Sequence, residues 1–276
     1  MKFSLSTNWC NRRIEAGEEI VEQALDLGFE ELELGFHTTD LQAKEIAALS
    51  SRIPIGSIHA FCPVPISAPQ GYPELYHLVD FDEETRKLAA IYVKRNIQFA
   101  ASVGADTVVL HAGRVACRGF FSRWDLRRRV KRGRKLVDIA RRELEGLLPE
   151  LERNHVVLGL ENLPYLEGFP AEWELKDLVG EWVKPWLDTG HDFVRRVNQW
   201  PSSCGCEIPF IQPVGLHISD SCGGDDHLPP GSGGVDFLSL REVAQKARHV
   251  VFEPSPRVSA SDLSRGLAHL RKIWNL

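Results

Sequence analysis

The stretch of residues 215–237, GLHISDSCGGDDHLPPGSGGVDF, carries three side chains with the chemistry to hold a metal ion. A short apolar run ends in His217, and a glycine-rich turn then brings Asp225 and His227. Imidazole nitrogen and carboxylate oxygen suit zinc or manganese, and a flexible loop lets the second pair fold back toward the first. Aspartate, glycine and proline are also common in surface turns for conformational reasons alone. This stretch therefore suggests a metal site without establishing one.

Ionisable side chains also end five other short apolar runs. These are His59, His111, Glu161, Asp188 and Glu253, with His191 three residues after Asp188. Burying so many ionisable groups together without a cation would cost a large free energy. We therefore predict a divalent metal site of one to three ions, built from these six residues together with His217, Asp225 and His227. The mixed nitrogen and oxygen ligands admit Zn²⁺, Mn²⁺, Co²⁺ or Mg²⁺.

Short strands that alternate with helices must position these side chains. The apolar patterns predict strands at residues 2–7, 31–36, 55–59, 107–111, 156–161, 185–188, 214–219 and 249–253. Helices are expected near residues 15–27, 40–50, 82–103, 173–181, 238–247 and 261–274, after His191, and in a segment ending near residue 153. Eight such units in about 250 residues predict an α/β fold, a single (β/α)8 TIM barrel domain over residues 1–276. A doubly wound open sheet is the alternative, but no G-x-G-x-x-G motif follows the first strand.

The barrel interpretation places the ionisable side chains at one end of the molecule. Active sites of such barrels lie at the carboxyl ends of the strands. A long proline-rich loop, residues 61–82, follows the third strand and either binds substrate or only covers the barrel mouth. We expect Phe61 in this loop, together with Trp9, to form an apolar wall beside the substrate. The basic segment of residues 118–135 is either a phosphate-binding surface or a solvated helix face.

Composition limits the classes of partner. The chain has 276 residues, of which 43% are hydrophobic, and a net charge of −5. This charge supplies no global positive field for nucleic acid, which argues against that partner but leaves a small phosphodiester open. No apolar run approaches the roughly 18 residues of a membrane span. The six cysteines form no C-x-x-C pair and no signal peptide is recognisable, so we expect reduced thiols in a cytoplasmic protein.

The order of these strand-end residues resembles that of the xylose isomerase-like TIM barrel superfamily. This superfamily includes sugar phosphate isomerases and epimerases and the endonuclease IV-like proteins. Its isomerase and epimerase members hold one divalent metal with four ligands, which match Glu161, Asp188, His217 and Glu253. Its endonuclease IV-like members hold three zinc ions with nine ligands, and all nine positions are of the right type here. Epimerases of this group usually carry arginine at the position of His227. The endonuclease-like members carry histidine there, as this chain does.

The resemblance implies two alternative activities for one site. In an isomerase or epimerase of a small sugar, ketose or sugar phosphate, Glu161 and Glu253 would be both ligands and the acid–base pair. His191 and His227 would then bind substrate hydroxyls. In a multinuclear zinc phosphodiesterase, Glu161 would bridge metals and His59 and His111 would complete one ion. We favour the isomerase or epimerase because of the acidic charge. A degenerate barrel that only binds metal or sugar is a third alternative. Barrels of this kind often pair, so a homo-oligomer is also expected.

Overall fold

Eight parallel strands close into a barrel. The structure is a computed structural model that describes residues 1–115, 123–198 and 211–276, without the side chains of residues 123–126, 225 and 226. The barrel strands are β1 (Ser4–Ser6), β2 (Glu31–Leu34), β3 (Ile55–His59), β4 (Thr107–Leu110), β6 (Val157–Glu161), β8 (Val183–Asp188), β9 (Gly215–Ile218) and β12 (His249–Phe252). Their spatial order is β1-β12-β9-β8-β6-β4-β3-β2, and the ring closes between β1 and β2. This confirms the predicted (β/α)8 TIM barrel.

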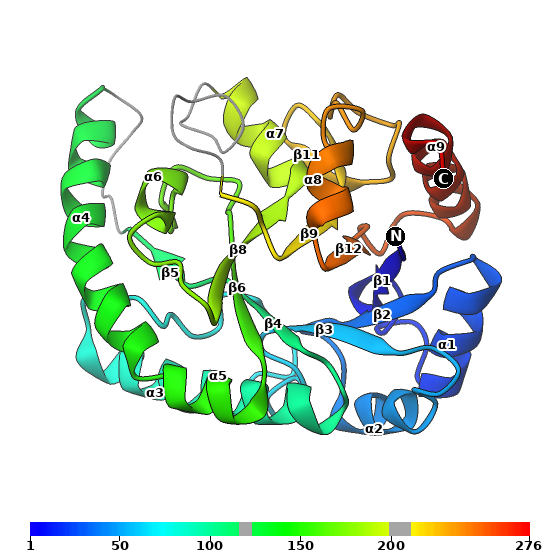
Figure 1. Ribbon diagram of the computed structural model, residues 1–276, viewed down its shortest axis with the longest axis horizontal. Helices are drawn as coiled ribbons and strands as arrows, with labels where there is room; N and C mark the ends of the chain where they lie inside the picture. The colour runs from blue at the N-terminus through cyan, green and yellow to red at the C-terminus, as the bar shows by residue number, and fades with distance from the viewer. Residues whose placement is uncertain (116–122, 199–210) are drawn as a thin grey trace.

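Helices surround the strands (Figure 1). They are η1 (Thr7–Trp9), α1 (Gly17–Asp26), α2 (Asp40–Ala48), α3 (Glu83–Ser102), α4 (Arg123–Glu145), α5 (Leu148–Asn154), α6 (Glu172–Leu175), α7 (Thr189–Val197), α8 (Arg241–Lys246) and α9 (Ala260–Trp274). Asp82 caps α3 by accepting the Thr85 amide at 2.7 Å, and Gly104, at φ 81°, follows its end. Helix α6 is shorter than the sequence predicts. Within the described ranges, no helix is both long and apolar enough to cross a membrane.

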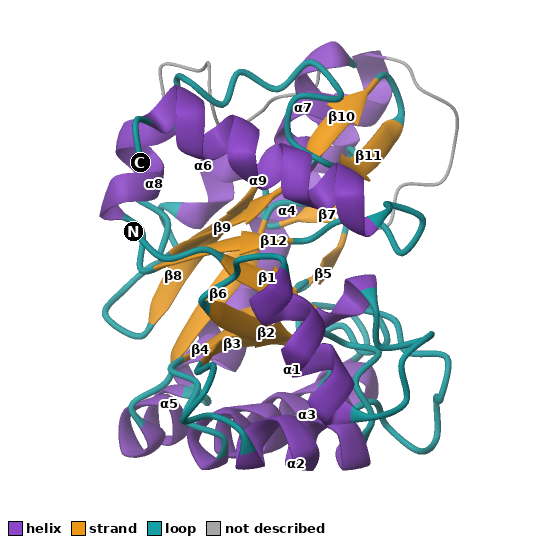
Figure 2. Cartoon of the chain, turned by 90° about the vertical axis from the view of Figure 1, so that its right-hand side faces the viewer, coloured by secondary structure: helices purple, strands orange, loops and turns teal. Residues whose placement is uncertain are grey.

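Two small antiparallel sheets lie beyond the carboxyl ends of the barrel strands. One pairs β5 (Gly113–Arg114) with β7 (Gly168–Phe169), and the other pairs β10 (Asp220–Cys222) with β11 (Asp225–Leu228). Figure 2 shows β10 and β11 side by side, apart from the barrel strands. The sequence predicted a loop for the segment that carries Asp225 and His227, and this was wrong, because the turn is confined to the glycines before Asp225. Such a hairpin fixes the backbone that carries these two residues.

A buried carboxylate fixes the loop that follows this hairpin. Asp220 is 1% exposed and accepts four backbone N–H groups. The donors are Ser221, Gly231, Gly233 and Val235, at 2.8–3.0 Å. A methyl group on Gly233 would overlap both the Asp220 carboxylate and the Ser221 backbone. The glycines of this segment therefore allow a close approach to one carboxylate.

One large aromatic side chain fills the middle of the barrel. Trp186, on β8, is 1% exposed and packs with Val109 and Val251. A methyl group on Gly215 would overlap the Trp186 ring, and one on Gly159 would press against it. The ring centroid of Trp186 lies 5.0 Å from that of His217 on one side and 6.1 Å from that of His249 on the other. The tryptophan thus separates two polar layers, one at each end of the barrel.

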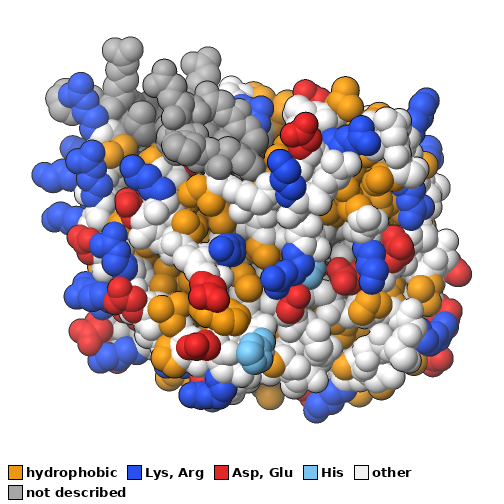
Figure 3. Space-filling view, viewed as in Figure 1, with side chains coloured by type: hydrophobic (Ala, Val, Ile, Leu, Met, Phe, Trp, Pro, Cys, Tyr) orange, Lys and Arg blue, Asp and Glu red, His pale blue; other side chains and the backbone are white. Residues whose placement is uncertain are grey.

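The basic segment divides between surface and interior. Arg128, Lys131, Arg134 and Lys135 of α4 are exposed, and basic side chains gather along this edge of the molecule (Figure 3). Arg129 is fully buried instead, with its guanidinium 2.7 Å from the Glu174 carboxylate. Residues 118–122 lie outside the described residues. The solvated-face interpretation therefore holds for most of the described helix, with a structural role for Arg129.

Candidate active site at the barrel mouth

A cavity of about 450 Å³ opens above the carboxyl ends of the strands. The predicted site residues on its wall are His59, His111, His191, His227 and Glu253. The lining is completed by Asn8, Phe36, His37, Glu74, Tyr165, Ser255 and four prolines, which are Pro73, Pro164, Pro254 and Pro256. None of the described residues on this wall is lysine or arginine. The cavity is therefore polar at its base and apolar at its rim.

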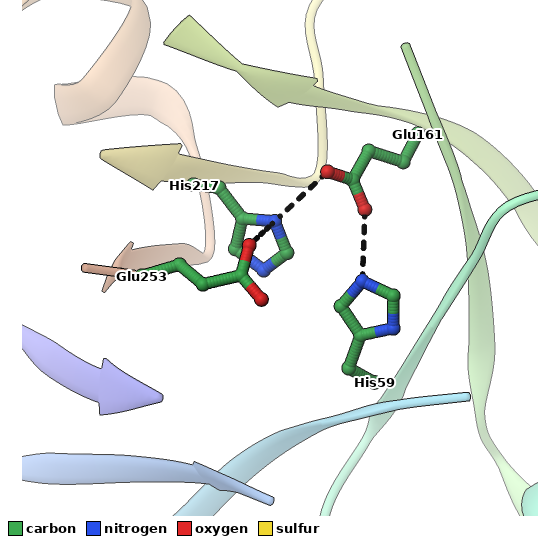
Figure 4. A group of neighbouring side chains, drawn as sticks. All are labelled: His59, Glu161, His217 and Glu253. Atoms are coloured by element: carbon green, nitrogen blue, oxygen red, sulfur yellow. Dashed lines mark hydrogen bonds and ion pairs between the residues drawn. The ribbon is translucent and has the colours of Figure 1, made fainter. Parts of the chain in front are cut away.

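Glu161 is the centre of the polar base. It ends β6 and has no solvent exposure. One oxygen, Oε2, lies 3.1 Å from Nε2 of both His59 and His111, and the other, Oε1, lies 3.1 Å from Nδ1 of His217. Figure 4 shows Glu161 between His59 and His217. Side chains from β3, β6, β9 and the end of β4 thus converge on one carboxylate.

Glu253 approaches the same histidine from the opposite side. Its Oε2 lies 3.1 Å from Nδ1 of His217, so that this nitrogen faces both Glu161 and Glu253 (Figure 4). The other oxygen of Glu253 accepts the Asn8 side-chain amide at 3.0 Å. Because Glu253 also lines the cavity, its carboxylate can reach a bound molecule.

Asp188 adds a buried carboxylate to this group. Its Oδ1 accepts the His191 amide at 2.7 Å and the Ser219 hydroxyl at 3.0 Å. Its Oδ2 is buried and has no hydrogen-bond partner among the described residues. A buried carboxylate oxygen left in this state requires an explanation, and an ion at this position supplies one. Ligand atoms of Glu161, Asp188 and His191 lie within 4.8 Å of one another, as a shared cation requires.

His227 belongs to a second group of residues that could hold a metal ion. Its Nδ1 donates to the backbone carbonyl of Glu253 at 2.9 Å, which orients the ring toward the cavity it lines. Ligand atoms of Asp188, His227 and Glu253 also lie within 4.8 Å of one another. A third group joins His59, Glu161, His217 and Glu253. The backbone of Asp225 lies on β11, but its side chain is outside the described part of the structure. The nine predicted ligands thus converge as far as their side chains are described.

The charges of this cluster reinforce one another. Burial alone would raise the pKa of Glu161, but the nearby His217 and His111 outweigh it and hold this pKa well below its usual value. Burial alone would lower the pKa of His217, but the carboxylates of Glu253, Glu33 and Glu161 raise it well above its usual value. A negatively charged ring of carboxylates around one imidazole is suited to a divalent cation, which would replace the proton on that imidazole.

Glu33 and Asn8 contact the predicted ligands but were not themselves predicted. Glu33, on β2, is completely buried with both carboxylate oxygens 3.2 Å from Nε2 of His217. Asn8 lines the cavity and holds Glu253. Strands of an all-parallel barrel are covered on their outer face by helices, so a charged residue within such a strand must point inward. The alternation of Glu31 and Glu33 with Leu32 and Leu34 therefore carried the signal for Glu33.

Two predicted substrate contacts lie elsewhere. Trp9 is 1% exposed, its indole N–H donates to the Val258 carbonyl at 2.8 Å, and it is not among the described residues on the cavity wall. Phe61 is equally buried and packs edge-on against Tyr76. Both are therefore residues of the hydrophobic core. The apolar wall is made instead by Phe36, Tyr165 and the prolines.

Comparisons with known proteins agree with this fold. The profile of the xylose isomerase-like TIM barrel family matches residues 21–273. No curated protein sequence matches the chain. Among solved structures, a D-tagatose 3-epimerase-like protein has a TM-score of 0.69 and 18% identity, covering 100% of this chain and 97% of its own.

Two further structures span nearly the same length. The 3-keto-D-glucoside 4-epimerase YcjR from E. coli has a TM-score of 0.66 and 19% identity over 99% of each chain. The IolI protein with a bound zinc atom has a TM-score of 0.70 and 13% identity over 100% of this chain and 98% of its own. At such identities these likenesses show a common fold. With the family profile spanning most of its residues, the chain belongs to the xylose isomerase-like TIM barrel family.

Proposed function

We propose that this protein is a divalent-metal-dependent isomerase or epimerase of a small sugar, ketose or sugar phosphate. The observation that carries the proposal is the placement of Glu161 and Glu253, each 3.1 Å from Nδ1 of His217. The two carboxylates would hold a divalent ion together with this nitrogen, and the same pair would supply the acid and the base for proton transfer. The sugar epimerases among the structural neighbours support the same assignment.

The residues present fit a divalent ion. Glu161, Asp188, His217 and Glu253 would hold it, and the unpartnered Oδ2 of Asp188 would gain a ligand bond. When bound, the ion would polarise a carbonyl and the adjacent hydroxyl and stabilise the enediolate of the substrate. The native ion is Zn²⁺, Mn²⁺, Co²⁺ or Mg²⁺ by ligand type, and zinc is bound in one of the similar structures.

The chain's own groups would move the proton. Glu253 lines the cavity, so its carboxylate would reach the hydrogen on the carbon beside the carbonyl. Glu161 would serve the opposite face, with its charge maintained by His59 and His111. His191, whose Nδ1 donates to the Asn162 carbonyl at 2.8 Å, and His227 would bind substrate hydroxyls. Phe36 and Tyr165 offer apolar faces to the sugar ring.

One variant tests the acid–base assignment. The wild-type protein is incubated with D-fructose, D-tagatose and related ketoses in D₂O with each divalent ion, and deuterium incorporation at carbon is followed by NMR. Glu161→Gln should abolish exchange and turnover while the thermal unfolding profile stays that of a folded protein. Glu31→Gln is the matched control, since Glu31 also contacts a histidine but lies at the other end of the barrel. Exchange retained in Glu161→Gln would refute the role of Glu161.

A multinuclear phosphodiesterase is the second candidate. The observation in its favour is that Nε2 of His59 and Nε2 of His111 lie at the same 3.1 Å from Oε2 of Glu161, which forms a second place for an ion. Against it, the described cavity wall has no lysine or arginine for a phosphate. Hydrolysis of bis(p-nitrophenyl) phosphate by protein loaded with two or three zinc ions would favour this candidate over the isomerase.

A further inference from the structure

Glu33 has no place in the proposed ligand set, yet its carboxylate is as fully buried as those of Glu161 and Asp188. It lies on β2, has no solvent exposure and does not line the cavity. Its partner His217 stands on β9, and β1 and β12 separate these two strands in the barrel. The contact therefore crosses the barrel interior. A carboxylate this deeply buried is costly unless it is paired, which makes the contact with His217 a defined part of the site.

The hydrogen bonds of Glu33 determine what it does to His217. Nε2 of His217 lies 3.2 Å from each oxygen of Glu33, and the Ser57 hydroxyl donates to Oε2 of Glu33 at 2.8 Å. An ionised carboxylate only accepts hydrogen bonds, so Nε2 of His217 must carry the proton. A cation that displaces the proton of the other nitrogen then meets the lone pair of that nitrogen, while Nε2 keeps its proton. That nitrogen, Nδ1, is the one that faces Glu161 and Glu253.

Other contacts already hold the plane of the His217 ring. It stacks on His59 with centroids 5.5 Å apart and an interplanar angle of 8°, and it meets Trp186 edge-on. Neither neighbour determines which nitrogen carries the proton. Among the contacts of Nε2 with described residues, the Glu33 carboxylate is the group that can do so.

We propose that Glu33 is a positioning residue that fixes the tautomer of His217 and so makes Nδ1 the metal ligand. The inference rests on the proposed function, because it requires the divalent ion of that site. Removing such an outer partner typically weakens metal binding 10–100-fold. Ser57 extends the arrangement by holding one oxygen of Glu33.

The test measures metal binding to the full-length protein. Co²⁺ is titrated into metal-free wild-type protein and into Glu33→Gln, and the visible absorption of the bound ion reports affinity and ligand geometry. We expect a dissociation constant 10–100-fold higher in Glu33→Gln, with the same number of ions per chain. Glu33→Asp, which keeps a carboxylate, should recover part of this affinity. The matched control is Glu31→Gln, which removes a carboxylate two residues earlier on β2 that contacts His249 instead. It should bind Co²⁺ as the wild type does.

Each result separates the inference from the function on which it rests. If wild-type protein binds no divalent ion, the proposed function fails. If wild-type protein binds Co²⁺ and Glu33→Gln binds it equally well, the positioning role is wrong and the function stands. A loss of one ion per chain in Glu33→Gln would also overturn the inference, because it would make Glu33 a ligand. Thermal unfolding of the metal-free variants shows whether each is folded. Should Glu33→Gln not fold, Ser57→Ala, which loosens one oxygen of Glu33, must still weaken Co²⁺ binding for the inference to survive.

Discussion

Replacing Arg129 by methionine should destabilise the protein more than any exposed substitution on the same helix. Arg129 is fully buried and donates to the carbonyls of Leu166 and Gly168 at 2.8 and 2.6 Å. It also donates to both oxygens of Glu174, at 2.7 and 2.9 Å. Arg129→Met would leave the 2% exposed Glu174 carboxylate and two carbonyls without this partner. Breaking a buried ion pair from one side costs about 3–5 kcal/mol.

The segment that Arg129 holds also forms part of the cavity wall. The two carbonyls belong to the loop that carries Tyr165 and Pro164, both of which line the cavity. Arg195 holds the same loop by donating to the Leu163 and Tyr165 carbonyls at 3.1 and 2.8 Å. The loss of stability in Arg129→Met should therefore be accompanied by greater motion of this loop, measurable as faster hydrogen exchange of residues 163–169.

Chemical denaturation gives the free energy of unfolding for this comparison. The exposed Arg128→Met is the matched control and should change it by no more than about 0.5 kcal/mol. The double variant Arg129→Met with Glu174→Leu should lose less free energy of unfolding than the two single variants together. The reason is that the double variant leaves no unpaired buried charge, whereas each single variant leaves one. A loss below about 1 kcal/mol in Arg129→Met alone would refute the reasoning.

Two further perturbations test the barrel interior. Glu31 and Asp106 outweigh burial and raise the pKa of His249 to about 9. Because this pKa is higher in the folded than in the unfolded protein, the stabilisation from protonated His249 is complete below about pH 6.5 and is lost as the pH rises through 9. The free energy of unfolding should fall by roughly 2 kcal/mol over that pH window, allowing for the half-exposed Asp106. His249→Gln should make the free energy of unfolding less dependent on pH over the same window. The same pH dependence in His249→Gln and the wild type would contradict the pairing. Gly215→Ala should lower the free energy of unfolding by about 1–3 kcal/mol, because the added methyl group overlaps Trp186. The control is Gly180→Ala, whose methyl group meets nothing within 4 Å. Equal stability of the two variants would contradict the packing around Trp186.

The strands and the ligands at their ends were predictable because each depends on local pattern. An apolar run of four to six residues between turn residues predicts a strand, and the carboxyl ends of parallel strands meet at one face. His59, His111, Glu161, Asp188, His217 and Glu253 therefore converge as predicted. Local pattern also predicted the helix near residues 82–103, which is α3.

What the sequence did not predict depends on contacts between distant segments. The partner of Glu33 lies 184 residues away, so the alternation along β2 predicts an inward-facing carboxylate but not the histidine that pairs with it. Trp9 and Phe61 follow strands and were predicted to face a substrate, but their direction depends on how the next turn packs. The burial of Arg129 within a run of exposed basic residues depends on Glu174, 45 residues later.

The metal content of the protein tests the central claim most directly. Protein purified without added metal is analysed for its elements, and the count per chain is compared with that of Asp188→Asn, which weakens the ligand set at its unpartnered oxygen. We predict about one divalent ion per chain in the wild type and substantially less in Asp188→Asn. Two or three zinc ions per chain would move the assignment to phosphodiester hydrolysis. No ion in purified protein, together with no binding of added Mn²⁺, Co²⁺, Mg²⁺ or Zn²⁺, would contradict the account.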